Sequence, residues 1–224
     1  MTCRIVVLAS GSGSNFEALC QALADGRISA AVISRLVVNR AAAGATSRAD
    51  RYGVPWEYFN LVTHGFLAKG ERDPDRVRRG RDEYDAALAR RLLDRPPSER
   101  PDLVVLAGWM HVFGTRFLEP MAEAGIDVIN LHPALPGQYD GAQAIERAYK
   151  DFRDGRLERN RTGVMVHHVI SKVDGGEPIL TREVECLPDD DLERLTARMH
   201  AVEHELIVEA TAKLVVSRQQ RRGP

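Results

Sequence analysis

A run of consecutive apolar residues near the start of the chain, Ile5-Val6-Val7-Leu8-Ala9, leads into the glycine-rich segment Gly11-Ser12-Gly13-Ser14-Asn15. A continuous apolar run rich in β-branched residues is typical of a strand that is buried on both faces of a parallel sheet. The next segment, residues 16–25, has the residue pattern of a helix. A strand, a glycine loop and a helix in this order predict the first unit of an α/β fold.

The same alternation continues along the chain. Further strands are predicted at residues 32–38, 103–107 and 128–131, and helices between them at residues 42–52, 75–93 and 115–124. Strands that alternate with helices in this way predict an α/β fold built on a doubly wound, mostly parallel sheet of Rossmann-like type.

The order changes after Gly141. We expect a helix that ends near residue 153, and then two strands, residues 163–170 and 179–185, joined by a turn at residues 174–176. This makes the C-terminal part of the sheet mixed. The segment Pro188-Asp189-Asp190-Asp191 supplies an N-cap and first-turn acids for a last helix from about residue 192 to 215. We expect residues 1–216 to form a single domain and residues 217–224 to be a disordered tail.

Composition limits the partners of the protein. The 31 Lys and Arg residues are balanced by 32 Asp and Glu residues, for a net charge of -1, so no overall basic field draws the chain to nucleic acid or to an anionic membrane. Cys3, Cys20 and Cys186 are scattered, without the spacing of a disulfide framework or a metal site. The N-terminal apolar run is too short for a signal peptide or a membrane span. We therefore expect a cytoplasmic protein without a metal.

The glycine loop lies between a strand and a helix, where free backbone N–H groups and the helix dipole favour an anion such as a phosphate. The dinucleotide-binding fingerprint requires a third glycine, but Phe16 occupies that position. The second strand leads into Asn39-Arg40 rather than into an acidic residue that would bind a ribose diol. The loop thus fits a single terminal phosphate better than a nicotinamide cofactor. A tight turn without any ligand is the alternative.

Asn130 and His132 follow a predicted buried strand, at the sheet edge where open α/β folds bind ligands. They are two residues apart, so they lie on one face if the strand continues through them. An amide donor and an imidazole that converge suit a carbonyl whose oxygen gains negative charge. Both side chains could equally be structural. Asp174 fits a turn, but it could approach the same face and hold His132 in its charged form by raising its pKa.

Six segments taken together resemble the phosphoribosylglycinamide formyltransferase family. In order, they are IVVLASGSGSN, PDLVVLAGWM, VINLHPALPG, TGVMVHHV, VDGGEPIL and the late pair Glu203-His204. The resemblance extends from residue 4 to about residue 210. Asn-x-His-Pro followed by Val-Asp-x-Gly is shared by folate-dependent formyl transferases and hydrolases.

The resemblance implies transfer of a formyl group from 10-formyltetrahydrofolate, a co-substrate, to the amine of glycinamide ribonucleotide (5'-phosphoribosylglycinamide) in de novo purine synthesis. No metal is implied. In this family pattern Asn130 donates to the formyl oxygen. His132 is the general acid that stabilises the tetrahedral intermediate, and Asp174 raises its pKa and orders water. Small molecules are then the partners, and the protein is a monomer or a homodimer.

The resemblance also implies the binding residues. For the ribonucleotide these are Gly13, Ser14 and Asn15 at the phosphate, and Glu203 on the last helix. For the folate they are Arg81, Met110, His111, Val112, Phe113 and Asn130. His167 matches a family histidine near the active site. For Met110, Val112 and Phe113, core packing is the simpler alternative.

Other functions are weighed against this one. Formyltetrahydrofolate hydrolases use the same three reacting residues with an additional N-terminal regulatory domain, and methionyl-tRNA formyltransferases add a C-terminal domain. We expect neither addition here. A nicotinamide dehydrogenase is disfavoured by Phe16, and a non-catalytic nucleotide-binding module by the joint presence of Asn130, His132 and Asp174.

Overall fold

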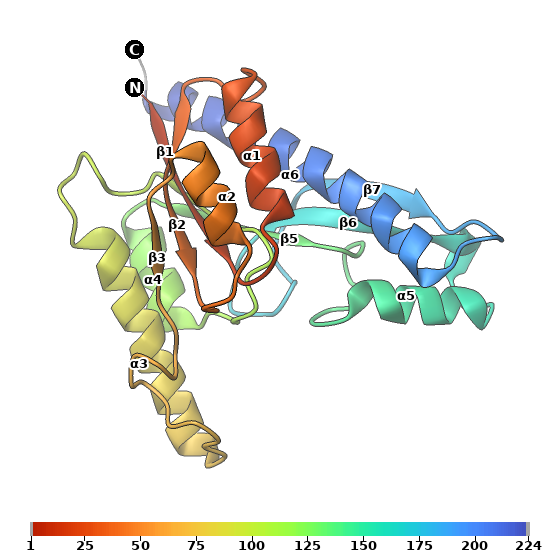
Figure 1. Ribbon diagram of the computed structural model, residues 1–224, viewed down its shortest axis with the longest axis horizontal. Helices are drawn as coiled ribbons and strands as arrows, with labels where there is room; N and C mark the ends of the chain where they lie inside the picture. Colours follow the sequence, from red (N-terminus) through yellow and green to blue (C-terminus); the bar gives the residue numbers. More distant parts are fainter. Residues whose placement is uncertain (1, 223–224) are drawn as a thin grey trace.

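The computed structural model describes residues 2–222, and this part of the chain contains one seven-stranded sheet (Figure 1). The strands are β1 (Cys3–Ala9), β2 (Ala31–Val38), β3 (Trp56–Tyr58), β4 (Leu103–Leu106), β5 (Asp127–His132), β6 (Arg161–His168) and β7 (Pro178–Glu185). Their order in the sheet is β3-β2-β1-β4-β5-β6-β7. The first five strands run parallel, whereas β6 is antiparallel to both β5 and β7. The predicted α/β class and the mixed C-terminal part are confirmed.

Helices cover both faces of the sheet (Figure 1). The helices are α1 (Ser14–Ala24), α2 (Ala45–Tyr52), α3 (Pro74–Leu93), α4 (Thr115–Glu123), α5 (Ala144–Arg153), the 3-10 turn η1 (Glu158–Asn160) and α6 (Leu192–Arg222). Side chains of β1 alternate between two buried clusters. Ile5 and Val7 pack with residues of α1, α2, α5 and α6, and Val6 and Leu8 pack with residues of α3 and α4. Burial on both faces explains the uninterrupted apolar run in this strand.

The order of the strands predicts where along the sheet a ligand binds. The chain leaves β1 toward β2 on one side and later returns to β4 on the other side of β1. At such a switch point the loops that follow the two central strands diverge and leave a crevice at their carboxyl ends. The glycine loop after β1 and the segment after β4 therefore border the same crevice.

Several elements differ from the prediction. The short edge strand β3 was not predicted, because Trp56-Glu57-Tyr58 is too short and too polar to show a strand pattern. Helix α2 begins at Ala45 rather than at residue 42, since Gly44 precedes its first turn. Strand β6 begins at Arg161 and ends at His168, two residues earlier at each end than predicted.

The predicted disordered tail is wrong for residues 217–222, which continue α6 to Arg222. Arg218 donates to the carbonyl of Gly125 at 2.8 Å and lies 3.4 Å from the carboxylate of Asp127. Arg221 contacts the same carboxylate at 3.4 Å. These bonds attach the last turns of α6 to the start of β5, and residues 223–224 lie outside the described residues. That residues 1–216 form one domain stays a prediction. In residues 2–222 there is no helix long and apolar enough to cross a membrane.

Candidate active site

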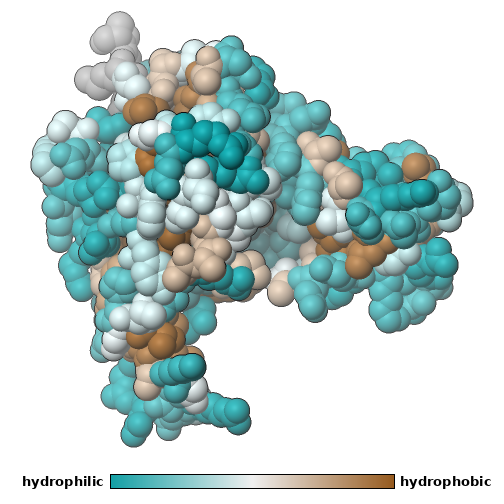
Figure 2. Space-filling view, in the orientation of Figure 1, coloured by the Kyte–Doolittle hydropathy of each residue, from teal (hydrophilic) through white to brown (hydrophobic). Residues whose placement is uncertain are grey.

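A cavity of about 370 Å³ opens at the carboxyl ends of β4 and β5. Its polar lining includes Asn15, Asn130, His132, His167, Asp174 and Glu203. Residues 106–113 form an apolar wall, and residues 141–144 close the side next to α5. Figure 2 shows that the surface is hollowed between the main body and the part that carries α5 and the N-terminal half of α6.

Asn130 and His132 both reach this cavity from the end of β5, as their spacing predicts. Asp174, from the loop after β6, lies between them. Its Oδ1 is 3.4 Å from Asn130 Nδ2, and its Oδ2 is 3.5 Å from His132 Nδ1. The structure thus brings together the three residues that the sequence proposed as the reacting centre.

The backbone of Asp174 is in the left-handed region, with φ of 48°. This conformation is costly for a residue with a side chain and persists only where surrounding contacts fix it. One such contact is the Gly141 N–H, which donates to Asp174 Oδ2 at 2.8 Å. A second is the close approach of Gly176 to the backbone of His168, where a Cβ atom would lie only 1.6 Å from the carbonyl oxygen. The loop is therefore held against β6 by backbone packing as well as by the carboxylate.

The ionisation of His132 differs from the expectation. Burial lowers the pKa of His132 below its ordinary value of 6.5, and the nearby Asp174 carboxylate offsets this only in part. The imidazole is therefore mostly neutral at pH 7 rather than held in its charged form. Burial acts to raise the pKa of Asp174, but hydrogen bonding with His167 and with the Gly141 N–H outweighs it, so this pKa is lowered. Among residues 2–222, His132 Nε2 is buried and has no hydrogen-bond partner.

His167 connects the centre to β6. It is paired with Asn130 across the antiparallel β5–β6 ladder, which places its Nε2 3.2 Å from Asn130 Nδ2 and 3.5 Å from Asp174 Oδ1. Its Nδ1 lies 2.9 Å from the carbonyl oxygen of His168, which fixes a hydrogen on this nitrogen. Sequence reasoning placed His167 near the site without a role, because the register of the antiparallel pair could not be known.

The glycine loop and α6 meet at one end of the cavity. Asn15 Nδ2 donates to Glu203 Oε2 at 3.1 Å, and both residues line the cavity. Burial raises the pKa of Glu203. Gly13 has φ of +79°, and a Cβ atom there would lie 2.6 Å from Ala45 of α2, so only glycine fits. Gly13 and Ser14 stand at the N-terminus of α1, which has no side-chain cap, and of this loop only Asn15 is among the residues that line the cavity.

The segment after β4 forms the opposite wall. The predicted folate residues differ in how exposed they are and in whether they line the cavity. Met110 and Val112 are 60% and 49% exposed and line the cavity, which is unlike core packing. Phe113 is buried and stacks on Phe117, so the core-packing alternative holds for most of its ring although it also lines the cavity. Arg81 is not among the lining residues, and it donates to the carbonyl of Val112 at 3.1 Å.

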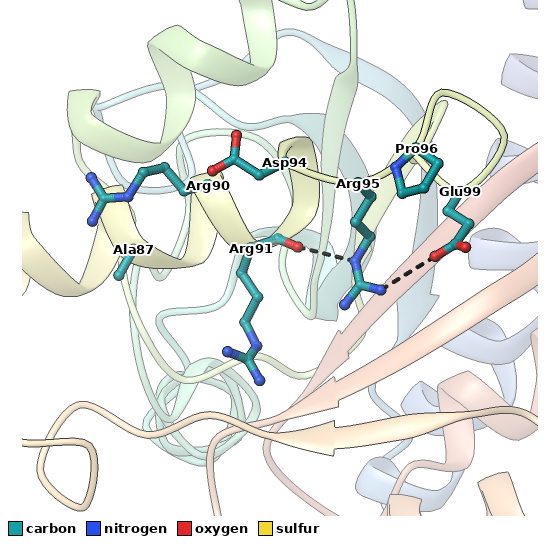
Figure 3. A pocket seen from close by; sticks show the side chains of 7 residues that line it. All are labelled: Ala87, Arg90, Arg91, Asp94, Arg95, Pro96 and Glu99. Carbon is teal, nitrogen blue, oxygen red and sulfur yellow. Dashed lines mark hydrogen bonds and ion pairs between the residues drawn. The ribbon is translucent and has the colours of Figure 1, made fainter.

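A second hollow, of about 550 Å³, lies on the surface at the C-terminal end of α3 (Figure 3). In it Arg95 donates to the carbonyl of Arg91 at 3.0 Å and pairs with Glu99 at 3.5 Å. Arg91 pairs with Glu57 of β3 at 2.7 Å. These pairs engage Arg91, Arg95 and Glu99 within the protein, and none of the predicted site residues lines this hollow.

Comparisons with known proteins identify relatives of this chain by sequence and by structure. The formyl transferase family model matches residues 3–211. The chain is 39% identical over 216 residues to phosphoribosylglycinamide formyltransferase of Schizosaccharomyces pombe, covering 96% of this chain and 98% of that protein. It is 38% identical to the protein of the same name from Dictyostelium discoideum, covering 94% and 97%. The crystal structure of phosphoribosylglycinamide formyltransferase from Bacillus halodurans matches with a TM-score of 0.77 at 26% identity, covering 96% and 97%.

The two glycines after Asp174 provide a test of the loop. We expect Gly176→Ala to lower the free energy of unfolding by about 1–3 kcal/mol, because its Cβ atom would collide with backbone. In Gly175→Ala the new atom meets only the flexible side chain of Lys172, which can move, so little change is expected. Both variants replace a glycine by alanine and so lower the conformational entropy of the unfolded chain equally. Thermal unfolding measures the difference, and equal melting temperatures would contradict the proposed packing.

The titration of His132 tests the electrostatics. We expect its imidazole to titrate below pH 6.5 in the unliganded protein, and Asp174→Asn to move the titration to still lower pH, because this carboxylate raises the pKa. Since the unfolded chain binds this proton at a higher pH, the stability contributed by neutral His132 is full above pH 6.5 and is lost as the pH falls toward the folded pKa. An NMR titration of the His132 ring proton on Cε1, identified by its absence in His132→Gln, measures the pKa in the wild-type protein and in Asp174→Asn. An upward shift in Asp174→Asn would refute this account.

Proposed function

The chain belongs to the formyl transferase family, and from this premise we propose that it transfers the formyl group of 10-formyltetrahydrofolate to the amine of 5'-phosphoribosylglycinamide in de novo purine synthesis. The observation that carries this proposal is the cavity itself. It holds Asn130, His132 and Asp174 at its centre, with Asn15 at the start of α1 at one end and an exposed apolar wall at the other.

The reaction joins the substrate amine to the formyl carbon and breaks the bond from that carbon to N10 of the folate. As the amine attacks, negative charge develops on the formyl oxygen, and the Asn130 amide is placed to donate a hydrogen bond to it. The lowered pKa of His132 leaves Nε2 free to accept the proton that the attacking amine must lose. The same proton then goes to N10 as it leaves.

Asp174 supports both steps. Its carboxylate lies beside Nδ1 of His132 and so favours the tautomer with the hydrogen on that nitrogen, leaving Nε2 as the acceptor. When the imidazole becomes charged, the ionised carboxylate stabilises it. In the sequence-based hypothesis His132 begins as a general acid, and its burial supports a role as base first and acid second.

The polar end of the cavity suits the ribonucleotide. We assign the phosphate to the backbone of Gly13, Ser14 and Asn15, where the α1 dipole favours an anion. Glu203, hydrogen-bonded to Asn15, lies beside this end and offers a buried carboxyl group to the rest of the substrate. The substrate would then extend from its phosphate at the start of α1 to its amine beside His132.

The apolar end suits the folate. Met110 and Val112 on one side, and Ile170 and Val173 on the loop that carries Asp174, are large apolar side chains exposed around the same cavity. Exposed apolar side chains that gather at a cavity are a mark of a ligand site. A flat pteridine ring between these two segments would place the formyl group on N10 of the folate near Asn130.

Four further expectations belong to this proposal. The partners are small molecules and the protein acts in the cytoplasm, which its three buried thiols suit. No group of three or more His, Cys, Asp and Glu that could hold a metal occurs in the described part of the chain. A reaction without a metal, and a monomeric or homodimeric state, stay predictions.

The acceptor decides between transfer and hydrolysis. We expect purified protein to consume 10-formyltetrahydrofolate only when the ribonucleotide is present, in a one-to-one ratio with the formylated product. Folate absorbance with and without the ribonucleotide, together with product mass, measures this. Formyl loss at the same rate without the ribonucleotide would assign the chain to the hydrolases instead.

Variants of the centre test the roles. We expect Asn130→Ala, His132→Ala and Asp174→Asn each to lower kcat by about 10²–10³-fold while KM changes little, because these groups act mainly on the transition state. His168→Gln is the control, since this neighbouring histidine does not line the cavity and should leave kcat within about twofold. Changes confined to KM would show that the three residues do not act in the chemical step.

A further inference from the structure

The α3 helix carries one buried carboxylate on its otherwise apolar inner face. Asp85 is 2% exposed and lies among Tyr84, Leu88 and Ala89, which belong to the core. A buried charge is costly unless it is fully hydrogen-bonded. This position therefore needs partners, and those observed belong to the segment that follows β4.

Both carboxylate oxygens of Asp85 bind groups of the segment that follows β4. Oδ1 lies 2.6 Å from His111 Nε2, and Oδ2 accepts the backbone N–H of Gly114 at 2.7 Å. The His111 side chain is 7% exposed and packs edge-on against Tyr84 and Phe113. The imidazole is thus turned inward to the carboxylate.

Gly114 is also the residue that precedes α4, and it brings no side chain to cap that helix. The Asp85 carboxylate stands at this N-terminus, where the helix dipole favours a negative charge. One carboxylate from α3 therefore caps α4 and holds the imidazole three residues earlier in the chain.

One turn before Asp85, Arg81 adds a third bond from the same helix face. Its guanidinium donates to the carbonyl of Val112. His111, Val112 and Gly114 are thereby attached to α3 at successive points, while the side chains of Met110 and Val112 are left exposed at the cavity.

We propose that Asp85, acting through His111 and the Gly114 amide and assisted by Arg81, is a positioning residue that sets the folate wall of the cavity. This inference rests on the proposed function. Asp85 touches no substrate. It fixes the backbone from which Met110 and Val112 present their side chains, so it controls folate affinity and leaves ribonucleotide binding and the chemical step alone.

Asp85→Asn tests the proposal. The amide can satisfy only one of the two donors, so we expect KM for 10-formyltetrahydrofolate to rise roughly tenfold, with kcat and KM for the ribonucleotide within about twofold. The control is Glu83→Gln, which removes the same charge from an exposed position of the same helix and should change none of the three parameters. A parallel rise of both KM values, or equal behaviour of the two variants, would overturn the proposal.

His111 provides a second route if Asp85→Asn folds poorly. His111→Ala should raise KM for the folate as Asp85→Asn does, and His111→Gln should recover part of the loss because its amide can donate to Asp85. In the double variant Asp85→Asn/His111→Ala the two effects should add less than fully, since both disturb the contact between Asp85 and His111. Full additivity, or no recovery by glutamine, counts against the proposal.

Arg81 separates positioning from direct contact. If it positions the wall, Arg81→Gln raises KM by the same factor for 10-formyltetrahydrofolate and for 10-formyltetrahydropteroate, which lacks the glutamate tail. A loss seen only with the tail would make Arg81 a ligand of the carboxylates and remove it from the proposal.

The outcomes also distinguish this inference from the proposed function. If the wild-type protein binds the folate but transfers no formyl group, the proposed function fails, and dissociation constants for the same variants still decide the role of Asp85.

Discussion

The antiparallel pairing of β6 with β5 determines where the reacting groups lie. This register sets His167 opposite Asn130 and ends β6 opposite Ile129, so the loop after β6 must reverse its direction to approach the end of β5. The reversal allows Asp174 to return within hydrogen-bonding reach of two residues on the neighbouring strand.

Two opposing effects then set the state of His132. The cavity that excludes water from the reacting atoms also removes it from the imidazole, and this desolvation outweighs the attraction of the single carboxylate at 3.5 Å. The unliganded protein consequently keeps a neutral imidazole beside an ionised carboxylate. Such a pair is poised to take up one proton and to return it, which is the requirement of a reaction in which one amine replaces another at the formyl carbon.

The sequence predicted this arrangement unevenly. Apolar runs such as residues 5–9 predict buried parallel strands on their own, and Asn130 and His132 follow from their position at a strand end. Asp174 did not, since a turn residue is placed by the packing of Gly176 on the His168 backbone, a contact between segments that no local pattern contains. The end of α6 was missed for a related reason, because Arg218 and Arg221 gain partners only when the helix crosses the start of β5.

Asp85 shows a different limit of sequence reasoning. In the pattern of α3 it is one acid among many charged residues, and nothing marks it as buried. Once the fold turns it inward, the cost of a buried charge requires a complete set of donors, and the segment after β4 supplies them through His111 and Gly114. The energetic demand of one carboxylate is thus met by ordering a wall that a ligand can use. Arg81, which the resemblance matches to a folate contact, lies outside the lining of the cavity and can serve the folate through the Val112 backbone that it holds.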